Sequence, residues 1–482
     1  MKKVFYNILS NGIYQIFIVI IPFLSMPYVS RVIGVEGVGI FSKVSSLVIF
    51  LSVFIIFGLG QLGSREIARS DLKDRSRRFS ELYSLQVVFG FLVTILFILF
   101  SIFFIKDNSL QKYYLLQLPL LVSYIFDISW FFIGIGEMTK VVVRNTTIKV
   151  LVVLLIFVLV HSKDDLWIYM MLNGISTLFA NFVLWKSLYK EIGKFELIIT
   201  SKYLKDGFIL LLPQIAVAII VQLAVTFVGS IGGTVAASYY DQSQKLIRVV
   251  LALLSSANIV LMPMMSKLDL KGSVNKINEI IFITIRIQLL LSFWFIVILY
   301  TNADVFIPWF FGTSFTPMVM NFKIAILLIM FNPIKALLDN QLLLARGLFK
   351  NYCLIMVTMA FINIFFICTF THFYGSVGAS VGMVLTEGIG LLIQLFVVRK
   401  YIEVRKLLSI SLSTLVALLV SIFLLSLFQY SASPFIAMLF KSIVGTICYV
   451  IIIMLISKEN RAFFFKAKEI ILKNIAYKRR LK

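Results

Sequence analysis

Residues Val87–Ile105 read VVFGFLVTILFILFSIFFI, a stretch without a charged side chain that is long enough to cross a membrane as one helix. Similar blocks recur along the chain, as at Leu47–Gly63 and Leu408–Phe428. Hydrophobic residues make up 60% of the 482 residues and charged residues 14%, whereas a soluble domain carries about 25% charged residues. The apolar blocks lack the strict alternation of a membrane β-barrel. The sequence therefore predicts an all-α integral membrane protein.

The apolar blocks predict about fourteen membrane-spanning helices. We place them at residues 7–29, 40–63, 82–105, 113–135, 145–160, 166–186, 207–229, 234–264, 280–302, 318–343, 352–371, 377–398, 408–429 and 435–456. No connection between these spans is long enough for a separate soluble domain.

The basic residues indicate the orientation of the chain. Alternate connections, together with both termini, hold 35 of the 45 lysines and arginines, and the other connections hold only Arg31, Lys106, Lys112 and Lys163. The positive-inside rule then places both termini in the cytoplasm. Topology and contact with anionic membrane lipids account for the net charge of +23, so nucleic-acid binding is not expected. The basic segment 458–482 is predicted to be an amphipathic helix on the inner leaflet.

A weak internal repeat relates the two halves of the chain. The connection Ile33–Ser42 has a counterpart six spans later at Ile231–Tyr240, with small residues and an aromatic residue at the same offsets. The fourth and tenth spans each carry an aspartate eight or nine residues before a glycine. Repeats six helices apart predict two six-helix bundles, at residues 1–200 and 201–400, facing each other across a substrate path. Helices thirteen and fourteen follow at residues 401–457.

The eighth span carries the clearest cluster of charges. A charged residue inside a span is costly to insert, about 2.5–3.5 kcal/mol, so each needs a reason. Asp241, Lys245 and Arg248 lie at i, i+4 and i+7, on one face of a helix. An Asp241–Lys245 salt bridge would hold helices together, but it leaves Arg248 without a partner on its own helix. The alternative is a water-filled cationic cavity, where a guanidinium beside an ammonium suits a phosphate or pyrophosphate group.

Four other ionisable residues inside spans are candidates for ion coupling. Asp127 and Glu387 are single carboxylates in the middle of spans, where burial favours the neutral acid. Each could take up a proton or sodium ion, or simply be a hydrogen-bonded neutral acid. Lys335 and Asp339 are four residues apart, which favours an ion pair as much as a coupling role.

Nothing in the sequence indicates catalysis, a cofactor or a metal site. Cys353, Cys368 and Cys448 have neither metal-ligand nor disulfide spacing, and the two histidines lie far apart. Motifs of zinc proteases, phosphate-binding loops and serine hydrolases are missing. A membrane-bound polymerase or transferase would gather acids and bases in a large outer loop, but the longest outer connection, at 303–317, holds one acid. An enzyme is therefore not expected.

Four stretches, in their order and spacing, resemble the Wzx-type polysaccharide flippases of the MOP exporter superfamily. They are Pro27–Gly34 (PYVSRVIG), Gly63–Ala68 (GSREIA), Tyr239–Lys245 and Trp309–Phe315 (WFFGTSF). The resemblance implies two six-helix bundles around a central cavity, with helices thirteen and fourteen added. It also implies transport of an undecaprenyl-pyrophosphate-linked oligosaccharide from the cytoplasmic to the outer leaflet of a bacterial plasma membrane.

From the resemblance and the charges together, we expect Arg248 and Lys245, with Lys43 and Arg31, to bind the pyrophosphate beside Asp241. Proton or sodium coupling would fall to the four ionisable residues above, and a polysaccharide polymerase is a candidate partner. A lipid II or teichuronic-type flippase shares this fold and charge pattern. A multidrug exporter of the MATE branch would need an acidic cavity for organic cations, which the positive eighth span argues against.

Overall fold

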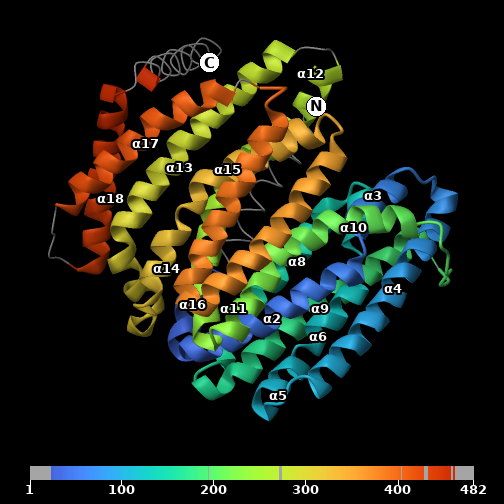
Figure 1. The fold of residues 1–482 in the computed structure, drawn as a ribbon. Helices are drawn as coiled ribbons and strands as arrows, with labels where there is room; N and C mark the ends of the chain where they lie inside the picture. Colours follow the sequence, from blue (N-terminus) through green and yellow to red (C-terminus); the bar gives the residue numbers. More distant parts are fainter. Residues whose placement is uncertain are drawn as a thin grey trace, which may run out of the picture.

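The computed structural model describes residues 23–193, 195–270, 274–402, 404–427, 433–456 and 460–461. These residues form helices and connections without a strand (Figure 1). Ten helical segments among them are long and apolar enough to cross a membrane. The predicted all-α membrane fold is therefore confirmed. Most of the first predicted span and nearly all of the predicted tail at 458–482 lie outside the described residues.

The elements follow one another in a simple order. After a helix at residues 23–32, the first half contains α2 (Gly34–Ile56), α3 (Leu59–Ala68), α4 (Leu72–Phe103), α5 (Asn108–Leu116), α6 (Leu118–Ser123), the 3-10 helix η1 (Tyr124–Phe126), α7 (Ser129–Gly134), α8 (Met138–Leu159), the 3-10 helix η2 (Lys163–Asp165) and α9 (Leu166–Ile192). The rest contains α10 (Leu204–Ala218), the π-helix η3 (Ile219–Leu223), α11 (Ala224–Ile231), α12 (Thr234–Leu270), α13 (Val274–Phe311), the 3-10 helix η4 (Thr313–Phe315), α14 (Met318–Ala325), α15 (Leu328–Leu338), the π-helix η5 (Asp339–Leu344), α16 (Phe349–Val398), α17 (Val404–Ser426) and α18 (Pro434–Ile456).

Every predicted span from the second to the fourteenth has a helical counterpart among these elements. The eleventh and twelfth spans are the two parts of α16, which breaks at Gly375 with φ 57° and ψ −139°. In Figure 1 the blue-to-green helices lie on one side and the yellow-to-red helices on the other. Helices α17 and α18 pack on each other and on α13 at the edge of the molecule.

The two repeated connections are tight turns that pack against each other. Gly34 and Gly233 have φ of 78° and 87°, which glycine adopts at little cost. The helix after the first turn starts at Gly34, earlier than the predicted residue 40, because one left-handed residue suffices to reverse the chain. A Cβ atom added to Gly39 would lie 1.9 Å from the backbone oxygen of Thr234. Helices α2 and α12 therefore meet backbone to backbone at the junction of the two halves.

The fourth and tenth predicted spans also end alike. Each closes with a glycine of positive φ, Gly136 at 80° and Gly347 at 71°, and with the six-residue hydrogen bond of a Schellman motif, 2.8 Å long in both. Each is irregular at its aspartate, because the backbone is extended at Asp127 and the π-helix η5 begins at Asp339. Both aspartates thus lie where a spanning helix departs from regular geometry.

Candidate functional site

A cavity of about 640 Å³ lies between the helices of the first half and α12. Its lining comes from residues 25–30, α2, the segment from η1 to α7, α8, α9 and α12. Among the described residues that line it, Asp127 is the one carboxylate. The cations that line it are Arg144, Lys149, Lys245 and Arg248. The walls are therefore net positive.

The α12 wall holds its two cations through Asp241. The Asp241 carboxylate is buried and accepts a hydrogen bond from Ser42 Oγ of α2 at 2.6 Å. It pairs with Lys245 Nζ at 2.6 Å and with Arg248 Nη2 at 3.3 Å. The side chains of Lys245 and Arg248 remain 30% and 39% exposed, so most of their N–H groups can still bind a ligand.

The expectation that Arg248 lacks a partner on its own helix was wrong. Asp241 lies two turns before Arg248 and still reaches it. Long side chains in a helix point back toward its N-terminus, and this direction brings the guanidinium to the carboxylate. The salt bridge and the cationic cavity, posed as alternatives from the sequence, therefore coexist.

The α8 wall contributes two cations, Arg144 and Lys149, that were not among the site residues predicted from the sequence. Helix α8 begins at Met138 instead of residue 145, so Arg144 lies inside the helix, and Lys149 lies in its middle instead of near its start. Arg144 is 8% exposed and donates to Asn181 Oδ1 at 3.1 Å and to Asn145 Oδ1 at 2.6 Å. The helical spacing of the polar residues Asn145 and Lys149 could have revealed this face.

The fourth span is broken where Asp127 faces the cavity. Gln86, fully buried on α4, donates to the carbonyl oxygens of Tyr124 at 2.7 Å and Asp127 at 2.9 Å. The Gln86 side-chain oxygen accepts from Trp130 Nε1 at 3.0 Å. Asp127 Oδ1 accepts from the backbone N–H of Ser129, the first residue of α7, at 3.0 Å. Irregular backbone at membrane depth is tolerated where side chains satisfy it and it lines a cavity.

The other candidate coupling residues form a buried cluster away from the cavity. Lys335 Nζ pairs with Glu387 Oε2 at 2.5 Å, and both side chains are less than 10% exposed. Asp339 instead accepts from Gln394 Nε2 at 2.6 Å. Glu387 is therefore not the single carboxylate that the sequence suggested, since its partner comes from a helix 52 residues away. None of these three charged residues lines the cavity.

Two expected pyrophosphate ligands, Lys43 and Arg31, also lie outside the cavity lining. The aliphatic part of Lys43 packs against Gly229 of α11, where an added Cβ atom would lie 2.9 Å from it. Arg31 is exposed and donates to the carbonyl oxygen of Trp309 at 2.5 Å, near the end of α13. The structure therefore does not bring these two cations to Lys245 and Arg248.

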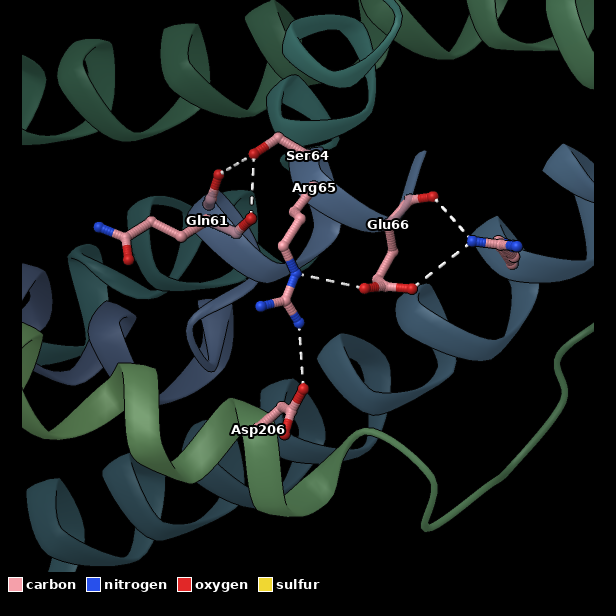
Figure 2. Close-up of polar contacts among 7 residues, drawn as sticks. Gln61, Ser64, Arg65, Glu66 and Asp206 are labelled. Carbon is pink, nitrogen blue, oxygen red and sulfur yellow. Dashed lines mark hydrogen bonds and ion pairs between the residues drawn. The ribbon is translucent and has the colours of Figure 1, made fainter. Parts of the chain in front are cut away.

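A second group of charges joins α3 to the start of α10 (Figure 2). Arg65 pairs with Asp206 of α10 at 3.0 Å and with Glu66 at 3.3 Å. Lys202, just before α10, lies 3.7 Å from Glu81 of α4. The Arg65 and Asp206 side chains are 42% and 54% exposed, and exposed ion pairs are worth about 0–1 kcal/mol. These contacts link the first half to the second without locking them together.

Residues 2–269 match the family described as polysaccharide biosynthesis protein. The chain belongs to this family. An Escherichia coli K12 protein named "Putative O-antigen transporter" is 20% identical over 380 residues, which are 76% of this chain and 90% of that protein. The solved structure of the lipid II flippase MurJ, in an inward closed conformation, superposes with a TM-score of 0.72 at 15% identity, covering 93% of this chain and 97% of that one. An inward-facing MATE multidrug transporter of the MOP superfamily superposes with a TM-score of 0.58 at 13% identity, covering 81% and 98%.

These likenesses show that the chain has the fold of the MOP exporters. The family and the named relative confirm the resemblance to Wzx-type flippases that the sequence motifs indicated. The chain is a multi-pass membrane transporter rather than an enzyme.

Proposed function

We propose that this protein moves an undecaprenyl-pyrophosphate-linked oligosaccharide repeat unit from the cytoplasmic to the outer leaflet of a bacterial plasma membrane. The observation that carries the proposal is the cationic cavity at the junction of the two halves. In it, Lys245 and Arg248 bind the pyrophosphate while the oligosaccharide occupies the rest of the space. The polyprenyl tail stays among the membrane lipids.

The chemistry of the cavity fits this cargo. An ammonium and a guanidinium held side by side by one carboxylate supply charge-assisted donors for a pyrophosphate. The remaining lining includes the amides and hydroxyls of Asn145, Asn173 and Thr177, which suit sugar hydroxyl groups. A protein named "Putative O-antigen transporter" is among the relatives and a lipid II flippase among the similar structures, and both names support a lipid-linked cargo.

Transport proceeds by alternating access in this proposal. The bundles at residues 1–200 and 201–400 rock about the close contact between Gly39 and Thr234, while residues 401–457 accompany the second bundle. With both termini in the cytoplasm, the Arg65–Asp206 ion pair lies at the cytoplasmic end and is weak enough to break in each cycle.

Ion coupling, to protons or sodium, is a further part of the proposal. Asp127 is the acid best placed for it, because its carboxylate lines the cavity and would feel the charge of the cargo directly. Asp339 is the second candidate, since a neutral amide is its hydrogen-bond partner. Glu387 is held by Lys335 and would first have to leave that pair. A polysaccharide polymerase would then use the delivered repeat unit.

The proposal is tested by reconstituting the purified protein in proteoliposomes with three cargoes. An undecaprenyl-pyrophosphate oligosaccharide, lipid II and the cationic dye ethidium are compared, and movement of the lipids is scored by protection from an impermeant hydrolase. We expect the first lipid to be moved and ethidium not to be transported, because a net positive cavity repels cations. Movement of ethidium alone would establish a multidrug exporter, and faster movement of lipid II would make that lipid the cargo.

A further inference from the structure

The α8 wall of the cavity presents a second group of cations opposite α12. The residues Asn145, Lys149, Val152 and Ile156 recur at helical spacing along this wall, so one face of α8 is turned to the cavity. Its polar end carries Arg144 and Lys149, and its other end is apolar.

Arg144 is fixed in place before any ligand arrives. Its guanidinium donates to Asn145 Oδ1 at 2.6 Å, to the carbonyl oxygen of Ala180 at 3.3 Å and to Ser129 Oγ at 3.3 Å. These contacts orient the guanidinium at the cavity wall. Because the side chain is already ordered, little rotamer entropy is lost when an anion binds.

Lys149 differs from the α12 cations in its surroundings. Asp241 holds Lys245 and Arg248, whereas no hydrogen-bond acceptor or carboxylate among the described residues contacts the ammonium of Lys149. The side chain is partly buried in the middle of a membrane-spanning helix. A cation in such a place is expensive without an anion, which marks it as a binding residue.

The two walls lie at similar depth in the membrane. Lys149 is ten residues before the end of α8 at Leu159, and Lys245 is eleven residues after the start of α12 at Thr234. With a rise of about 1.5 Å per residue, each cation is roughly 15 Å from its helix end. The end of α8 and the start of α12 lie on the same side of the molecule, because both lie near the first turns of α2. A Cβ added to Gly34 would touch Lys163, which follows α8 closely, and a Cβ added to Gly39 would touch Thr234, the first residue of α12.

We propose that Arg144 and Lys149 form a second anion-binding subsite, which takes a negatively charged group of the cargo in addition to the phosphate that is bound on α12. The inference rests on the proposed function and specifies its substrate: the cargo carries negative charge at two places across the cavity. The second anion is either the carboxylate of an acidic sugar or the second phosphate of the pyrophosphate. Both are oxyanions that a guanidinium and an ammonium recognise.

Equilibrium binding to the full-length protein in nanodiscs tests the subsite. The three lipids are undecaprenyl pyrophosphate with a neutral trisaccharide, the same lipid with one glucuronic acid in the trisaccharide, and undecaprenyl monophosphate with the neutral trisaccharide. Lys149→Gln is compared with wild type, with Lys149→Arg and with Lys186→Gln, which removes the same charge from the exposed face of α9. Thermal melting confirms folding, and Lys149→Gln should melt no lower than wild type.

We expect Lys149→Gln to weaken binding about ten-fold or more, while Lys149→Arg and Lys186→Gln remain close to wild type. A loss confined to the glucuronic acid lipid identifies a sugar carboxylate, and a loss for both pyrophosphate lipids but not the monophosphate identifies the second phosphate. Binding of all three lipids by Lys149→Gln at wild-type affinity overturns the subsite.

The same experiment separates this inference from the proposed function. If Lys245→Gln/Arg248→Gln binds normally while Lys149→Gln does not, the α8 subsite stands and the α12 assignment fails. If the wild-type protein binds none of the three lipids, the cargo class is wrong and the subsite is rejected with it.

Discussion

Replacing Glu387 by Gln should destabilise the protein far more than breaking an exposed ion pair. The Lys335–Glu387 pair is 2.5 Å long and both side chains are more than nine-tenths buried, so Glu387→Gln leaves a buried ammonium without its carboxylate. Removal of one partner of such a pair costs about 3–5 kcal/mol. Replacing both partners, as in Lys335→Met/Glu387→Met, removes the charge altogether and should recover most of that loss.

The free energy of unfolding is measured by titrating detergent micelles with a denaturing detergent. The matched control is the exposed pair of Lys323 and Asp304, which is 2.7 Å long with side chains 22% and 65% exposed. Its disruption by Asp304→Asn should cost no more than about 1 kcal/mol. A Glu387→Gln variant as stable as Asp304→Asn, or a double Met variant no more stable than Glu387→Gln, would show that no uncompensated buried charge is created.

The same variants separate stability from coupling. If the double Met variant folds and still moves lipid, the Lys335–Glu387 pair is structural. If it folds with recovered stability but moves no lipid, the pair takes part in the transport cycle, and coupling is assigned to Glu387 instead of Asp127.

Three further predictions concern the scaffold of the site. Gly39→Ala should abolish correct folding, because its Cβ would lie 1.9 Å from the backbone oxygen of Thr234. Gly60→Ala should be tolerated, because its Cβ would have no other atom within 4 Å. Expression and thermal melting of the two variants provide the comparison. Gln86→Leu should lower the free energy of unfolding by roughly 2–4 kcal/mol, since it leaves the Asp127 carbonyl and the Trp130 N–H without their Gln86 partner and removes a donor from the Tyr124 carbonyl. An unchanged unfolding curve would contradict that role. Hydrogen bonds from Ser109 and Leu110 lower the pKa of Asp107, which caps α5 outside the spans, so Asp107→Ala should melt below wild type at neutral pH. Because the pKa is depressed in the folded state, the difference in melting temperature should shrink as the pH falls below 3.8 and the wild-type carboxylate becomes protonated. Melting curves across this pH range check the prediction.

The helices could be predicted from the sequence because their signal is local. Uncharged blocks such as Val87–Ile105 must satisfy their own backbone hydrogen bonds in lipid, so a helix follows from composition and length alone. The stripe of Asp241, Lys245 and Arg248 was likewise predictable, since helical geometry places residues at this spacing on one face.

The rest of the site depends on contacts between distant segments. The partner of Lys335 is Glu387, 52 residues away, and no spacing rule gives the packing of α15 on α16. Charges lower local hydrophobicity, so the predicted span was shortened to start at residue 145. Arg144 therefore fell outside it, and Lys149 fell near its start instead of in the middle of the helix. Lys43 and Arg31 were included on the resemblance and on their charge, but the directions of their side chains depend on contacts with Gly229 and Trp309 that tertiary packing creates.

The most direct test of the central claim is lipid flipping by Lys245→Gln/Arg248→Gln in proteoliposomes. A lipid-linked pyrophosphate oligosaccharide is the cargo, and protection from an impermeant glycosidase is the readout. The control is Lys186→Gln/Lys190→Gln, which removes two charges from the exposed face of α9. With folding verified by thermal melting, we expect wild type and control to move the lipid and the α12 variant not to move it. Equal movement by all three proteins would contradict it, and Lys245 and Arg248 would then be structural.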